Sequence, residues 1–198
     1  MYSGTSFVYL DYRNYYQLDS PIDYSTFVDL IVDDIVRDSK KKYSFLGISM
    51  GSTVALHVLN RMYNIGLGDC IDEISVLSSK FHLNNSFSKL LYSDLALIEE
   101  LERYGQFSSS DFSDPEVLDY FLTEVRRDLR ILDLLNSNPV TQVFELKGCV
   151  VTGVDDKAVT EKDIKSWTQF FPSINVHSVQ GGHFFMKDRG MDLYEILN

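Results

Sequence analysis

Short apolar runs alternate with segments of helical periodicity along most of the chain. Runs rich in β-branched and aromatic residues and bounded by turn residues are typical of strands. Such runs lie at residues 6–12, 42–49, 71–78, 147–153 and 174–180. Segments whose apolar residues recur every three or four positions predict helices. These segments lie at residues 23–39, 50–64, 160–171 and 188–197. Strands that alternate with helices predict an α/β fold, a mostly parallel sheet with helices on both faces.

Local signals mark the ends of several predicted helices. Asp23 or Ser25 can cap the first helix, and Gly66 follows shortly after the end of the second. Thr160 and Asp163 have the spacing of a capping box at the start of the third. The helical boundaries therefore rest on capping chemistry as well as on periodicity.

The middle of the chain departs from this alternation. From about residue 81 to residue 137 the pattern predicts only helices, at residues 88–105 and 114–135, with a serine-rich loop between them. Asp114 followed by Pro115 is a favourable helix start. The 198 residues therefore predict a single domain that carries a helical insertion at about residues 81–137.

The charge balance narrows the range of partners. The chain has 29 acidic and 18 basic residues and a formal net charge of −11. This excess argues against nucleic acid and anionic membranes, which attract proteins through Lys and Arg. No segment approaches about 18 consecutive apolar residues, so we expect no transmembrane helix. The N-terminus lacks the basic and apolar regions of a signal peptide. We expect a cytoplasmic protein that acts as a monomer.

The two cysteines, Cys70 and Cys149, are far apart and form no C-x-x-C motif. This spacing argues against a disulfide framework and against a zinc cluster. We interpret both as reduced core residues, and we expect neither a metal nor another cofactor.

Ser49 has the sequence context of a nucleophile. It lies in Gly47-Ile48-Ser49-Met50-Gly51, between a predicted strand and a predicted helix. A G-x-S-x-G turn between a strand and a helix is the nucleophile elbow of α/β-hydrolases. The tight turn explains the glycines, because a Cβ at Gly47 or Gly51 is expected to clash. The N-terminus of the following helix favours negative charge near Ser49.

A serine nucleophile needs a base, and His183 is the best placed histidine. His57 and His177 lie inside a predicted helix and a predicted strand, and His82 begins the insertion. His183 instead follows two glycines just after a predicted strand, where parallel sheets place their chemistry.

Asp155 and Asp156 also follow directly after a predicted strand, and either carboxylate could orient the histidine. A glycine followed by aspartates is common turn chemistry too. Nevertheless, the chain order serine, aspartate, histidine is the order of α/β-hydrolase triads. The sequence therefore predicts acyl transfer through a serine.

Four motifs together carry a family resemblance. Residues 47–51 read G-I-S-M-G against the family's G-H-S-M-G, and residues 181–185 read G-G-H-F-F as in the family. Residues 153–159 match G-x-x-D-x-x-V and are followed by Trp167, and residues 125–128 are similar to L-R-x-D. Over nearly its whole length the chain resembles the type II thioesterases of non-ribosomal peptide and polyketide synthesis, which are α/β-hydrolases. The G-x-x-D register selects Asp156 over Asp155.

The chain departs from the family at two places. Ile48 replaces the histidine before the nucleophile. The family also has an extra strand and helix before residues 6–12, and a loop there supplies one oxyanion-hole N–H. Only 48 residues precede Ser49. We therefore expect this N-terminal part to be missing, with the N–H of Met50 left as one oxyanion donor and activity lowered.

The resemblance implies a thioesterase that removes acyl groups from the phosphopantetheine arm of an acyl or peptidyl carrier protein. Ser49 would be the nucleophile, His183 the base and Asp156 its orienting carboxylate, with the insertion as a lid. Two alternatives stay open: a truncated, weakly active homologue that binds the carrier protein, and a small-molecule carboxylesterase.

Overall fold

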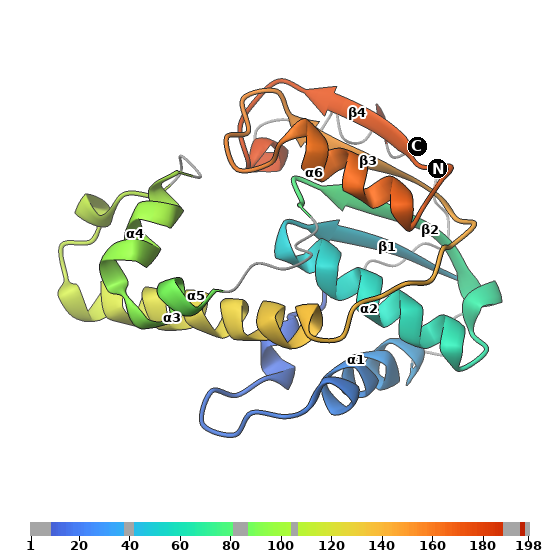
Figure 1. The fold of residues 1–198 in the computed structure, drawn as a ribbon, viewed down its shortest axis with the longest axis horizontal. Helices are drawn as coiled ribbons and strands as arrows, with labels where there is room; N and C mark the ends of the chain where they lie inside the picture. Colours follow the sequence, from blue (N-terminus) through green and yellow to red (C-terminus); the bar gives the residue numbers. More distant parts are fainter. Residues whose placement is uncertain (1–8, 38–41, 81–86, 104–106, 188–194, 197–198) are drawn as a thin grey trace.

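The computed structural model describes five stretches of the chain, residues 9–37, 42–80, 87–103, 107–187 and 195–196. Within them, a four-stranded sheet has the order β1-β2-β3-β4. The strands are β1 (Tyr43–Ile48), β2 (Ile71–Leu77), β3 (Lys147–Gly153) and β4 (Asn175–Val179). Every neighbouring pair is parallel, so all four carboxyl ends meet at one edge of the sheet (Figure 1).

The helices α1 (Tyr24–Arg37), α2 (Met50–Asn64) and α6 (Glu161–Ser166) contribute to the main core on one face of the sheet. The strand order follows the chain order, so right-handed crossovers place the connecting helices on the same face. Figure 1 shows α2 and α6 running in front of the strands. The core between these layers includes Phe27, Leu56, Ile74, Val150 and Trp167, each almost fully buried. The predicted α/β-hydrolase fold class is confirmed.

The opposite face of the sheet carries a smaller apolar cluster, to which the loop after β4 contributes. Leu77, Val151 and Val179 form a smaller cluster with Phe185, which begins the 3-10 turn η5 (Phe185–Lys187). On the edge strand β1, by contrast, Leu46 and Ile48 are 54% and 42% exposed.

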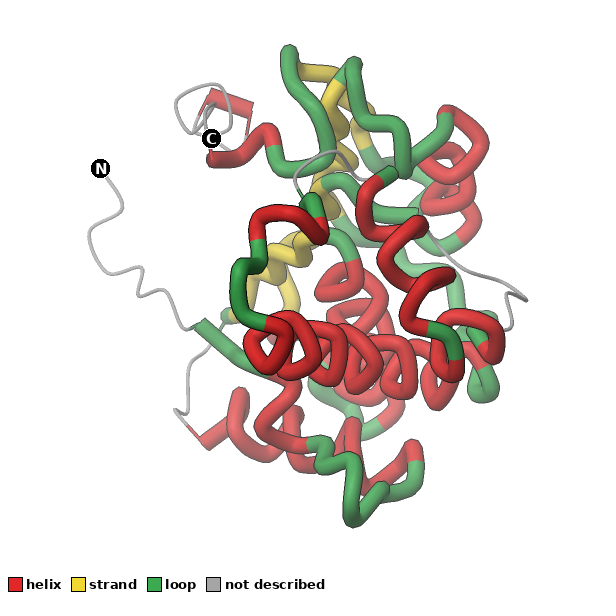
Figure 2. The backbone as a smooth tube through the Cα atoms, turned by 90° about the vertical axis from the view of Figure 1, so that its left-hand side faces the viewer, coloured by secondary structure: helices red, strands yellow, loops and turns green. Residues whose placement is uncertain are grey.

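Between β2 and β3, the described residues 87–103 and 107–136 form a helical segment. It contains α3 (Ser88–Tyr92), α4 (Asp94–Glu102), the 3-10 turn η3 (Ser109–Asp111) and the long helix α5 (Pro115–Asn136). Ile131 and Leu135, near the end of α5, are buried in the main core. The rest of the segment extends past the carboxyl edge of the sheet, and Figure 2 views the molecule from that side, with the strands behind the helices.

Several predicted boundaries are confirmed and others are wrong. β3 and α2 have the predicted bounds, and the capping box of Thr160 and Asp163 is formed. The single helix predicted over residues 88–105 is wrong, because Ser93 interrupts it and its side chain caps α4. The helix predicted over residues 160–171 ends early, at Ser166, and continues as the 3-10 turn η4 (Trp167–Gln169).

The strand predicted over residues 6–12 is wrong for the residues that the structure describes. Tyr9 and Leu10 form no strand, and Tyr12 begins the 3-10 turn η1 (Tyr12–Tyr15), which the side chain of Asp11 caps. Residues 6–8 lie outside the described residues. Of the predicted helix at 188–197, residues 195–196 are helical and the others lie outside the described residues.

No described helix is long and apolar enough to cross a membrane.

His57 is a buried titratable side chain in α2. It is 1% exposed, and its Nδ1 lies 3.1 Å from the hydroxyl of Tyr24 on α1. Burial disfavours the charged imidazolium and lowers the pKa of His57 to about 4. The histidine therefore joins the two helices in its neutral form.

This burial makes the stability of the fold depend on pH. In the unfolded chain His57 takes up a proton near its ordinary pKa of about 6.5, whereas the folded chain does so only near pH 4. Stability is therefore present above about pH 6.5 and is lost as the pH falls, by about 3 kcal/mol at pH 4. Chemical denaturation of the wild type and His57→Gln between pH 7 and pH 4 measures this difference, and parallel curves would contradict it.

Candidate active site

Ser49 lies on the sharp turn between β1 and α2. Its φ of 51° is in the left-handed region, where a non-glycine residue is strained. The turn is held by two backbone hydrogen bonds, from the N–H of Ser49 to the Leu77 carbonyl (2.8 Å) and from the N–H of Ser52 to the Ser49 carbonyl (3.1 Å). The chain thus turns from strand to helix within one residue.

Of the two glycines that flank Ser49, only Gly47 is required by space. A Cβ at Gly47 would lie 2.3 Å from the Cα of Ser52, closer than real atoms approach. A Cβ at Gly51 would meet nothing nearer than a ring atom of Tyr12 at 4.0 Å. The expectation of a clash is confirmed at Gly47 and wrong at Gly51.

His183 lies in the loop after β4 and points at Ser49. Its Nε2 lies 3.1 Å from the Ser49 Oγ, and its Nδ1 lies 2.9 Å from the Asp156 Oδ2. The side chain of His183 is only 3% exposed and that of Asp156 is fully buried. The loop reaches this position because Gly153 lets it approach closely: a Cβ there would lie 2.3 Å from the Gly181 carbonyl oxygen.

Asp156 is held as a carboxylate by several donors. Its Oδ1 accepts hydrogen bonds from the N–H groups of Ala158 (2.8 Å) and Val159 (3.1 Å). Burial alone would raise the pKa of Asp156, but His183 and these two N–H groups together outweigh it and hold the pKa below its ordinary value. The neighbouring Asp155 is exposed. The structure therefore brings Asp156, and not Asp155, to the histidine.

The other histidines lie elsewhere. His57 is buried in α2 against Tyr24, and His177 lies within β4. His82 lies outside the described residues. Within the described part of the chain, no three His, Cys, Asp or Glu side chains are grouped so that they could hold a metal ion.

Met50 is the first residue of α2, directly after Ser49. The first N–H groups of a helix have no partner inside it and lie at the positive end of the helix dipole. The N–H of Met50 is thus of the kind that can stabilise an oxyanion beside Ser49. Any donor supplied by residues 1–8 lies outside the described residues.

An ion pair ties the helical segment to the turn after residue 11. The Nε of Arg13, in η1, donates to the Asp128 Oδ1 on α5 at 3.0 Å. Burial raises the pKa of Asp128 to about 6, although the charge of Arg13 opposes the rise. Asp128 is the aspartate of the L-R-x-D-like motif, so this motif residue makes a contact between α5 and η1.

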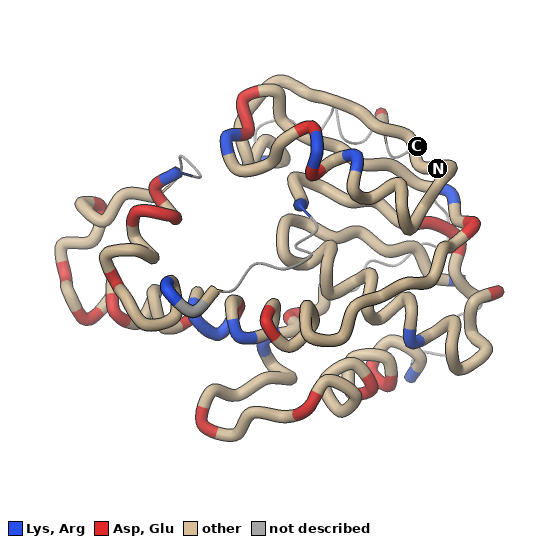
Figure 3. The backbone as a smooth tube through the Cα atoms, in the orientation of Figure 1, with Lys and Arg blue, Asp and Glu red and all other residues tan. Residues whose placement is uncertain are grey.

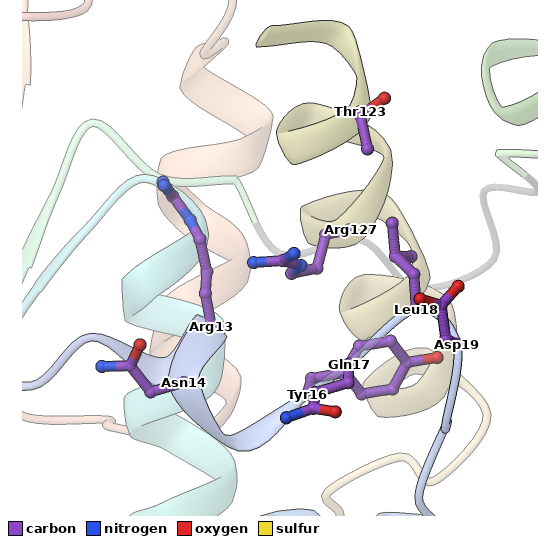
Figure 4. A pocket seen from close by; sticks show the side chains of 8 residues that line it. All are labelled: Arg13, Asn14, Tyr16, Gln17, Leu18, Asp19, Thr123 and Arg127. Atoms are coloured by element: carbon purple, nitrogen blue, oxygen red, sulfur yellow. The ribbon is translucent and has the colours of Figure 1, made fainter. Parts of the chain in front are cut away.

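An open pocket of about 460 Å³ lies beside this ion pair, between residues 13–19 and α5. Arg13, Arg127 and Thr123 are among the side chains that line it (Figure 4). Ser49, Asp156 and His183 do not line it.

Basic residues form a blue run on α5 in Figure 3, which the sequence identifies as Arg126, Arg127 and Arg130. Two of them are already paired, Arg126 with Asp94 and Arg127 with Glu124. Much of the positive charge on this helix is therefore balanced within the chain.

One contact at the elbow could not be predicted from local sequence pattern. The hydroxyl of Ser79, just after β2, donates to the backbone carbonyl of Ser49 at 2.7 Å. Two serines after a strand are ordinary turn residues, so only the fold could reveal this contact.

The fold is that of known α/β-hydrolases. RedJ, a thioesterase from the prodiginine biosynthetic pathway in Streptomyces coelicolor, aligns with a TM-score of 0.73 at 21% identity, over 88% of this chain and 71% of its own. YbtT, a type II thioesterase from the yersiniabactin NRPS/PKS biosynthetic pathway, aligns with a TM-score of 0.72 at 17% identity, over 88% and 72%. Human thioesterase 2 aligns with a TM-score of 0.63 at 18% identity, over 84% and 79%. No family model matches the chain, and no curated protein sequence matches it.

We expect Asp156→Asn to lower the rate of ester hydrolysis by about 10⁴-fold, because an amide opposite His183 favours the wrong tautomer. Asp155→Asn is the matched control, since the Asp155 side chain is exposed. Initial rates with a p-nitrophenyl ester measure both variants. Equal losses, or a larger loss for Asp155→Asn, would refute the assignment of the acid.

Proposed function

We propose that the chain is a serine hydrolase that cleaves acyl thioesters, with Ser49 as nucleophile, His183 as general base and Asp156 as the orienting carboxylate. One observation carries the proposal: a continuous line of hydrogen-bonding contacts, from the Ser49 Oγ through both ring nitrogens of His183 to Asp156. A serine, a base and an orienting acid in this order are the requirements for nucleophilic acyl transfer.

In the acylation step, Ser49 attacks the carbonyl carbon and His183 Nε2 accepts the serine proton. Asp156 stabilises the imidazolium that forms, since its carboxylate contacts Nδ1. The Met50 N–H stabilises the oxyanion of the tetrahedral intermediate. His183 then gives its proton to the departing sulfur, the carbon–sulfur bond breaks, and an acyl-enzyme and a free thiol result.

In the deacylation step, water attacks the acyl-enzyme and His183 takes one proton from it. The second tetrahedral intermediate collapses, the proton returns to the Ser49 oxygen, and a carboxylic acid leaves. The chemistry needs no metal or cofactor, because the serine, histidine and aspartate supply all the proton transfers.

The proposed substrate class is an acyl group on the phosphopantetheine arm of an acyl or peptidyl carrier protein in non-ribosomal peptide or polyketide synthesis. The G-G-H-F-F and G-x-S-x-G motifs support it. The fold likeness to RedJ, YbtT and ClbQ, a protein of the colibactin NRPS/PKS pathway, adds support from structure. Type II thioesterase membership is part of the same proposal.

The helical insertion expected at about residues 81–137 is proposed as the lid of a single domain, and the helical segment is its described part. It lies on the carboxyl side of the strands (Figure 1), where acyl chain and arm would approach. Phe87, Leu91 and Leu132 form an apolar cluster that Met50 also contacts. The segment thus reaches the residue that follows the nucleophile.

A carboxylesterase is the second candidate, because a marine microorganism esterase also shares the fold, with a TM-score of 0.55 at 13% identity over 89% of this chain and 78% of its own. The triad chemistry is the same for oxygen and sulfur esters, so the leaving group distinguishes the two functions.

The test compares hydrolysis of an acyl-phosphopantetheinyl carrier protein with hydrolysis of a p-nitrophenyl ester of the same acyl chain. We expect a higher kcat/KM for the carrier substrate and no turnover above background in Ser49→Ala, which removes a single oxygen. Preference for the simple ester would favour the carboxylesterase. Retained turnover in a folded Ser49→Ala would refute the serine mechanism altogether.

A further inference from the structure

Two strained residues lie side by side at the carboxyl edge of the sheet. Among the described residues, Ser49 and Ser78 are the only non-glycine residues with positive φ, at 51° and 43°. They follow the paired residues Ile48 and Leu77, the last of their strands in register. The left-handed backbone is unfavourable for serine, because its Cβ approaches the following carbonyl oxygen. Contacts around Ser78 must therefore stabilise this kinked conformation.

The kink directs Ser79 to the elbow. The N–H of Ser78 is still held on the sheet, by the Val151 carbonyl at 2.9 Å. One residue later, the Ser79 hydroxyl donates to the Ser49 carbonyl at 2.7 Å, and Ser79 is 2% exposed. The Ser79 carbonyl accepts a hydrogen bond from Trp167 Nε1 at 3.0 Å. Ser79 is therefore held on both sides.

The carbonyl that Ser79 contacts belongs to the peptide group whose N–H is that of Met50. A peptide group is planar and trans, so its C=O and N–H point in opposite directions. The Ser49 carbonyl accepts both from the N–H of Ser52 at 3.1 Å and from the Ser79 hydroxyl at 2.7 Å, and these two donors together fix the direction of the Met50 N–H. A hydrogen bond to the carbonyl also polarises the peptide and strengthens the N–H as a donor.

We propose that Ser79 is a positioning residue that orients and polarises the Ser49–Met50 peptide as an oxyanion donor. This inference rests on the proposed function, because it needs a tetrahedral oxyanion at Ser49. Ser79 contacts no reacting atom itself. Its effect is on the transition state, where charge develops on the oxygen, and not on the binding of substrate.

The experiment uses Ser79→Ala, with Thr152→Val as the matched control. Thr152 is also buried, at the end of β3, and its hydroxyl has no hydrogen-bond partner among the described residues. For Ser79→Ala we expect kcat to fall about tenfold, as for the loss of one buried hydrogen bond, with KM unchanged. The affinity for an alkyl trifluoromethyl ketone, which forms a tetrahedral oxyanion on serine, should fall by the same factor. Thr152→Val should keep both values.

Rescue separates positioning from simple packing. Ser79→Thr keeps a hydroxyl and should recover most of kcat and of the ketone affinity; if it does not fold, Ser79→Cys should give intermediate values. The proposal is overturned if folded Ser79→Ala keeps kcat within about twofold and loses only thermal stability, or if KM rises instead.

The outcome is separable from that of the proposed function. If the wild type hydrolyses only the p-nitrophenyl ester, the carrier substrate is wrong but the Ser79 comparison proceeds on the ester. If the wild type neither hydrolyses esters nor binds the ketone, there is no active nucleophile, and both the hydrolase proposal and the Ser79 proposal are refuted.

Discussion

The left-handed backbone at Ser49 is the constraint on which the rest of the site depends. A left-handed backbone at a non-glycine residue destabilises the fold by about 1–3 kcal/mol, and interactions in its surroundings must offset this cost. Here they do so with the strand register that holds the Ser49 N–H on Leu77, and with the absence of a side chain at Gly47. The turn places Ser49 directly after β1 and begins α2 at the next residue. Nucleophile and helix N-terminus are thus two results of one turn.

Parallel pairing then decides which side chains can reach that turn. Because β1, β3 and β4 end at the same edge, the loops after β3 and β4 bring Asp156 and His183 to Ser49 from more than a hundred residues away in sequence. A buried carboxylate is stable there only with donors around it. The N–H groups of Ala158 and Val159 are two such donors, in addition to His183. The loop that carries the acid therefore also stabilises its charge.

The sequence predicted the parts of this arrangement that depend on local pattern. Strand β3 and helix α2 were found at their observed residues, because apolar periodicity and capping are local properties. The break at Ser93 was missed, because a serine is tolerated within a helix and only the structure shows its side chain acting as a cap. The contact between Ser79 and the elbow joins segments thirty positions apart and depends on the kink at Ser78, so no spacing rule could find it.

Helix α5 has two differently packed parts: its C-terminal end is buried in the main core, and its N-terminal part lies beyond the sheet. Ile131 and Leu135 anchor the end of α5 in the main core, whereas its first turns extend past the sheet (Figure 1). Between these parts lies the ion pair of Arg13 and Asp128. Burial raises the pKa of Asp128 to about 6 even beside an arginine, so desolvation offsets much of the attraction. The pair therefore fixes where α5 meets η1, while Ile131 and Leu135 bury the end of the same helix in the main core.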